Sequence, residues 1–121
     1  MAEPLLFGCS HGENAPERAT VPFIAAATAA AAGHRAIVVC TIDAVWLGLA
    51  EHAERVAEPG MPALLDLQRH LVEGDGEIWL CSACTTKRGI TGDMPLVPGA
   101  QIVGAATIVE ALTLGRAITL A

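Results

Sequence analysis

Aromatic residues and positive charges are scarce in this sequence of 121 residues. It has no Tyr, two Trp and two Phe, and its 7 Lys and Arg residues face 13 Asp and Glu residues, a net charge of −6. Surfaces that bind nucleic acids need a basic patch and often aromatic side chains on which bases stack. The sequence therefore predicts no nucleic-acid partner.

A hydrophobic run of membrane-spanning length is missing from the first half of the chain, although 53% of all residues are hydrophobic. The longest uncharged run there covers residues 19–33 and is shorter than the roughly 20 residues that a membrane-spanning helix needs. No basic segment precedes the apolar residues 5–7, which argues against a signal or transit peptide. We therefore expect a cytoplasmic protein without a membrane partner.

Apolar runs of strand length alternate with longer helical segments along the chain. The expected strands cover residues 5–9, 36–41, 77–81, 101–104 and 117–120, and the expected helices cover 16–33, 44–50, 62–73, 82–88 and 107–114. Asp43 is interpreted as the N-cap of the second helix. Continuous apolar strands are typical of a parallel sheet that is buried on both faces. We expect one domain over residues 1–121, with a three-layer α/β/α fold around a mainly parallel five-stranded sheet.

Three of the four cysteines fall at or beside the carboxyl end of an expected strand, where ligands and reactive groups collect in parallel sheets. These are Cys9, Cys81 and Cys84. Cys40 continues an apolar run and is interpreted as a small buried hydrophobic residue. In an acidic chain without a leader, free thiols, metal ligands or reactive groups are favoured over a disulfide framework.

The segment with sequence CSACTTKRG, residues 81–89, carries the strongest chemical signal. A thiol at the start of a helix faces free backbone N–H groups, which favour the thiolate over the thiol. Arg88 follows Cys84 by four residues and lies on the same helix face, so its charge is expected to add to this effect. A pair of cysteines with this spacing does not by itself choose among redox, metal-binding and sulfur-transfer chemistry.

Three alternatives to sulfur transfer stay open from the residues alone. Cys81 and Cys84 fit a dithiol redox site, although a thioredoxin-like protein places its pair on a long helix after an earlier strand. A Cys₃His metal site would combine Cys9, His11, Cys81 and Cys84. A non-catalytic oligomeric binding or scaffold protein would bury the apolar surface between its subunits, and its cysteines would have no chemical role. The sequence calls for no organic cofactor.

The order and spacing of several motifs resemble the DsrE/DsrF-like family of small sulfur-relay proteins. The first is residues 6–23, LFGCSHGENAPERATVPF, and others are residues 32–34, 43–47 and 99–106. A further match is Cys81, seven residues before Arg88, Gly89 and Ile90. The usual turn of the family, Gly-Pro-Glu-Asp, is replaced here by residues 11–14, HGEN. The resemblance covers nearly the whole chain.

The resemblance implies a three-layer fold that assembles into homotrimers or homohexamers. It also implies that Cys81 accepts sulfur as a persulfide from a donor protein and passes it to an acceptor. We add the hypotheses that Cys84 is a resolving thiol and that Arg88, His11 and Cys9 support the site. A sulfur carrier or sulfurtransferase is therefore the leading interpretation.

Overall fold

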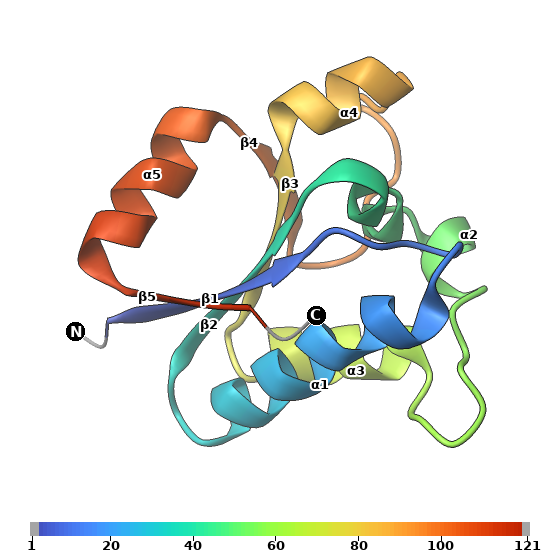
Figure 1. Ribbon diagram of the computed structural model, residues 1–121, viewed down its shortest axis with the longest axis horizontal. Coiled ribbons are helices and arrows are strands. Elements are labelled where there is room, and N and C mark those ends of the chain that lie inside the picture. Colours follow the sequence, from blue (N-terminus) through green and yellow to red (C-terminus); the bar gives the residue numbers. More distant parts are fainter. Residues whose placement is uncertain (1–2, 120–121) are drawn as a thin grey trace.

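The computed structural model describes residues 3–119 and shows a five-stranded sheet between helices (Figure 1). Its strands are β1 (Pro4–Cys9), β2 (Arg35–Cys40), β3 (Glu77–Cys81), β4 (Ala100–Val103) and β5 (Arg116–Ile118). They run in the order β4-β3-β2-β1-β5, and each neighbouring pair is parallel. The expected α/β fold with a parallel five-stranded sheet is confirmed.

The helices lie on both faces of the sheet and at its carboxyl edge (Figure 1). They are α1 (Pro16–Ala31), α2 (Ala50–Ala53), α3 (Leu64–Glu73), α4 (Ser82–Arg88) and α5 (Ala105–Leu114). A 3₁₀ helix, η1 (Ile42–Gly48), follows β2. Helices α1 and α3 pack side by side on one face, and α5 covers the other.

Side-chain alternation along the strands divides the core into two layers. Phe23 of α1 and Leu64 of α3 belong to the larger layer, together with strand residues such as Val38. The smaller layer, on the α5 side, contains Ala111 and the following strand residues: Leu6, Ile37, Val39, Trp79 and Val103. The α5 side therefore has a thinner cover than the α1 and α3 side.

The segment between β2 and α3 is the main place where the expected elements are wrong. Instead of one helix over residues 44–50, the chain forms η1 and then the separate short helix α2. Asp43 lies inside η1 and caps no helix, because its carboxylate is bound by groups from distant segments. Helix α3 begins at Leu64, two residues after Pro62.

The other differences are confined to element ends. Helix α1 ends at Ala31, and Gly33 follows with a φ of 91°, a conformation that glycine adopts without strain. Helix α5 begins two residues earlier than expected, at Ala105. The last strand is β5, and the expected strand residue Leu120 lies outside the described residues. Within residues 3–119, no helix is long and apolar enough to cross a membrane.

Candidate functional site

Cys81 is the last residue of β3 and the N-cap of α4, so strand and helix together fix its position. Its side chain is partly exposed. The backbone N–H of Cys84 lowers the pKa of the Cys81 thiol most, against an opposing effect of burial, and the Cys84 side chain and the Ala83 N–H lower it further. A thiol that receives donors from the first turn of a helix ionises more readily. The direction of this pKa shift therefore agrees with the thiolate expected at the start of this helix.

Cys84 lies in the first turn of α4, and its side chain helps to lower the pKa of the Cys81 thiol. It is partly buried and packs against the larger core layer. Gly89 then ends α4 with a φ of 74°, and the N–H of Ile90 donates to the Thr85 carbonyl at 2.9 Å. The left-handed Gly89 thus ends this short helix, whose N-cap and first turn carry the two thiols.

The Arg88 guanidinium bonds to groups other than the Cys81 thiol. Its Nε and Nη2 donate to Asp43 Oδ1 at 3.3 and 3.0 Å, and its Nη1 donates to the Cys84 carbonyl at 3.2 Å. The guanidinium is not among the groups that lower the Cys81 pKa. With a side chain only 15% exposed, Arg88 instead fixes the backbone of the cysteine pair to η1.

Asp43 connects three segments at the carboxyl edge, and sequence reasoning missed this role. Besides Arg88 it receives a long hydrogen bond from Asn14 Nδ2 at 3.5 Å, in the loop between β1 and α1. Gly12 of the same loop lies directly against the Asp43 backbone, where an added Cβ would be 2.6 Å from the carbonyl oxygen. The strand order offers the one indication of this role: Asp43 follows β2, and β2 is the neighbour of β3, which ends at Cys81.

Cys9 and His11 lie apart from the cysteine pair. Cys9 is 3% exposed in the core layer of α1 and α3, where its thiol donates to the carbonyls of His11 and Ala19 at 3.6 and 3.7 Å. Alternation along β3 places Cys81 on the opposite face, the side of Trp79. His11 Nδ1 lies 3.3 Å from Ser10 Oγ.

The residues of the alternative Cys₃His metal site, Cys9, His11, Cys81 and Cys84, are not grouped around one point in the described part of the chain. Across residues 3–119, no three His, Cys, Asp or Glu side chains are grouped closely enough to hold a metal ion. Cys40, by contrast, is fully buried beside Cys9, as its apolar surroundings predicted. The contact with Cys9 and, after it, burial raise the pKa of the Cys40 thiol, as is typical of an unreactive core cysteine.

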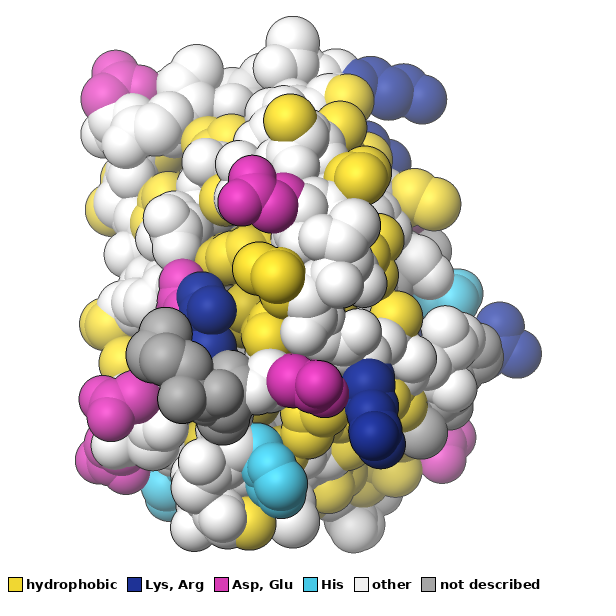
Figure 2. Space-filling model, turned by 90° about the vertical axis from the view of Figure 1, so that its left-hand side faces the viewer, with side chains coloured by type: hydrophobic (Ala, Val, Ile, Leu, Met, Phe, Trp, Pro, Cys, Tyr) yellow, Lys and Arg dark blue, Asp and Glu magenta, His cyan; other side chains and the backbone are white. Residues whose placement is uncertain are grey.

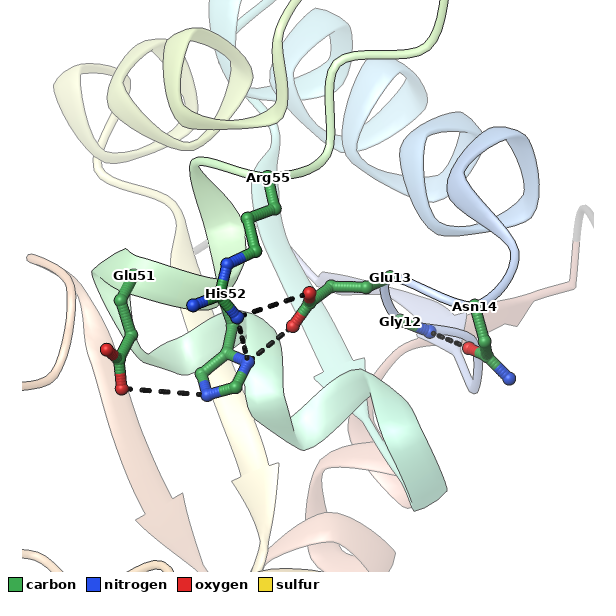
Figure 3. A network of polar contacts seen from close by, with 6 residues as sticks. All are labelled: Gly12, Glu13, Asn14, Glu51, His52 and Arg55. Carbon is green, nitrogen blue, oxygen red and sulfur yellow. Dashed lines mark hydrogen bonds and ion pairs between the residues drawn. The ribbon is translucent and has the colours of Figure 1, made fainter.

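A second polar network ties the loop between β1 and α1 to α2 (Figure 3). Glu13 accepts from His52 Nδ1 and, at 3.3 Å, from Arg55 Nη1. The hydrogen bond from His52 is the main cause that lowers the pKa of the Glu13 carboxyl, with a smaller contribution from Arg55. The His52 ring lies 4.8 Å from that of Trp46 in η1, between centroids. The loop is thus held at Asp43 and at His52.

Comparison with known proteins agrees with this architecture. The family model of the DsrE/DsrF-like family matches residues 4–120. Among solved structures, the crystal structure of the ychN protein from E. coli superposes with a TM-score of 0.78 at 19% sequence identity, covering 99% of this chain and 100% of that one. At that identity the likeness concerns the fold alone. A search of curated proteins gives no match. The match over nearly its whole length shows that the chain belongs to the DsrE/DsrF-like family.

Proposed function

We propose that this protein carries sulfane sulfur on Cys81. The observation that carries the proposal is the partly exposed Cys81 thiol, whose pKa is lowered by N–H groups at the start of α4. The Cys81 thiolate attacks the outer sulfur of a donor persulfide, the donor's S–S bond breaks, and the donor leaves as a thiolate that takes a proton from water. Cys81 then holds the outer sulfur as its own persulfide.

Delivery follows one of two balanced routes. A thiolate of an acceptor protein attacks the outer sulfur and releases the Cys81 thiolate unchanged. Alternatively, the Cys84 thiolate attacks the inner sulfur, which forms a Cys81–Cys84 disulfide and expels hydrosulfide. The contact between the two side chains supports the second route, and an external thiol must then reduce the disulfide.

The proposal is tested by exposing the protein to inorganic polysulfide, removing the excess and weighing the intact chain. We expect wild type to gain sulfur, and the rate to rise with pH around a midpoint below that of an ordinary thiol, because the thiolate is the nucleophile. Cys81→Ser is expected to gain none at this position, as mapped by peptide mass analysis. A wild type without any adduct on Cys81 would favour the scaffold interpretation instead.

We also propose that the apolar surface of α5 mediates assembly into the homotrimers or homohexamers that the family resemblance implies. Val109 and Leu112 are 57% and 42% exposed and lie three residues apart, on one side of the helix. Figure 2 views the molecule from the side that appears at the left in Figure 1, and hydrophobic side chains gather across it. Exposed apolar patches of this kind mark interaction surfaces.

A charge placed in this surface is expected to weaken assembly by about a hundredfold or more, since the charge would have to be desolvated in the interface. The variant is Val109→Glu combined with Leu112→Glu, and the measurement is the molar mass in solution by light scattering across a dilution series. Met94→Glu is the control, because Met94 is exposed and apolar but lies outside α5. Equal masses for all three proteins would reject α5 as the interface.

A further inference from the structure

Ile42, the first residue of η1, has a backbone conformation that its side chain disfavours. Its φ is 52°, in the left-handed region, where a β-branched residue is strained. Among the described residues, Asp75 is the other non-glycine residue with positive φ, at 66°. Asp tolerates that region because its short polar side chain can bond locally, and it stands in a Gly-Asp-Gly turn. The strain at Ile42 has no such explanation.

The surroundings hold Ile42 in place from both sides. On one side, the N–H of Thr41 donates to the Cys9 carbonyl at 2.9 Å, which extends the contact between β2 and β1. On the other side, Asp43 is anchored by Arg88 at 3.0 Å. The residues on both sides of Ile42 are thus anchored, and strained positions held by their surroundings cluster at functional sites.

Burial of the side chain does not offset this strain. Ile42 is 53% exposed, although isoleucine is among the residues that proteins bury most often. A polar residue or glycine would serve the turn better and would leave less apolar surface in water. The chain thus presents an apolar side chain to solvent at a position where folding alone favours a different residue.

The register of the sheet places Ile42 near the proposed nucleophile. Cys40 is paired with Leu80, so Thr41 and Cys81 are the next residues along two neighbouring parallel strands. With adjacent strands about 4.8 Å apart and consecutive Cα atoms 3.8 Å apart, the Cα atoms of Ile42 and Cys81 lie within about 10 Å of each other. Asp43, the nearest acidic group in sequence, forms an ion pair with Arg88. The two residues together therefore add no net charge to the surface beside Ile42.

We infer that Ile42 is a specificity-determining contact for the sulfur donor: it selects a polypeptide segment with apolar side chains beside its persulfide cysteine. This inference rests on the proposed sulfur-carrier function of Cys81. The donor segment lies across the carboxyl edge, its apolar neighbour residue packs on Ile42, and its outer sulfur meets the Cys81 thiolate. The Cys81 thiolate then takes that sulfur, and the donor segment departs as a thiolate, so no oxidant or reductant is required.

The test compares two synthetic donors that differ only beside the persulfide. They are the cysteine persulfides of acetyl-Leu-Cys-Leu-amide and acetyl-Ser-Cys-Ser-amide, and the rate of sulfur gain on Cys81 is followed by rapid quenching and mass analysis. Wild type is expected to react about fivefold faster with the leucine peptide, the effect of one partly buried apolar contact. Ile42→Asn removes the apolar side chain yet tolerates the left-handed backbone, so it is expected to react equally with both. Ile42→Val is the matched control and keeps the preference.

The outcomes separate the inference from the function on which it rests. If neither peptide loads Cys81 in wild type, the sulfur-carrier function fails and the inference fails with it. If both load wild type at equal rates, the function stands and the inference is overturned, whether Ile42 makes no contact with the donor or is covered by a second copy of the chain.

A thermal unfolding measurement checks the strain independently. Ile42→Asn should be at least as stable as wild type, and a clear loss of stability would show that Ile42 is retained for packing.

Discussion

Replacement of Cys84 by serine is expected to slow strongly the release of sulfide from the sulfur-loaded protein while leaving Cys81 able to accept sulfur. The Cys84 backbone N–H, which lowers the Cys81 pKa most, is retained in the variant, and a hydroxyl replaces the thiol that contacts Cys81. Only the intramolecular attack on the Cys81 persulfide is lost. Because such an attack profits from the high effective concentration of a neighbouring group, we expect release to slow by about a hundredfold or more.

The measurement loads the protein with polysulfide, removes the excess, and follows free sulfide and the mass of the unreduced chain over time. Wild type should release sulfide and end two hydrogens lighter than the reduced protein before loading, which marks the Cys81–Cys84 disulfide. The Cys84→Ser protein should keep its extra sulfur until an external thiol is added. Ser82→Ala changes the same turn without touching either thiol and serves as the control. Undiminished release from Cys84→Ser would contradict the resolving role and leave transfer to an acceptor protein as the route.

Local patterns predicted β3 and α4 to the residue, and the reason is physical. The apolar run of β3 ends at Cys81, the short helix begins at Ser82, and Gly89 supplies the left-handed residue that stops it. Each of these signals acts within a few residues along the chain. The alternation of strands with helices likewise predicted the parallel sheet, because parallel neighbours require crossover connections.

The roles of Arg88 and Asp43 depend on contacts that no local pattern encodes. Their side chains meet across 45 positions of sequence, so an expected helix cap became an ion-pair partner. The separation of Cys9 from Cys81 has a similar origin. Both residues end strands at one edge of the sheet, but they point to opposite faces, and which helix covers which face is decided by the tertiary fold. The strained Ile42 is also invisible to composition and periodicity, because isoleucine there predicts continued strand or helix.

The contact between Gly12 and Asp43 leads to the largest stability effect that we expect from a change at the carboxyl edge. A Cβ on Gly12 would lie 2.6 Å from the Asp43 carbonyl oxygen and 3.3 Å from its carbonyl carbon. These are backbone atoms, so they cannot move aside as the tip of a side chain can. Gly12→Ala must therefore push the loop between β1 and α1 away from η1. By analogy with overpacked cores we expect a loss of about 2 kcal/mol, or roughly 8 °C in Tm.

Gly8→Ala is the matched control, four residues earlier, because an added Cβ there meets nothing within 4 Å. It should be neutral, or stabilising by up to about 1 kcal/mol, because alanine restricts the unfolded chain more than glycine does.

Displacement of Asp43 should also loosen Arg88, which donates a hydrogen bond to the Cys84 carbonyl at 3.2 Å. Gly12→Ala should therefore load sulfur more slowly at a temperature where it is fully folded. Slower loading with Gly8→Ala unchanged would show that the loop, Asp43 and Arg88 act together in positioning Cys81. A Gly12→Ala protein with wild-type Tm and loading rate would instead show that the loop adjusts freely and that this contact does not position the cysteine pair.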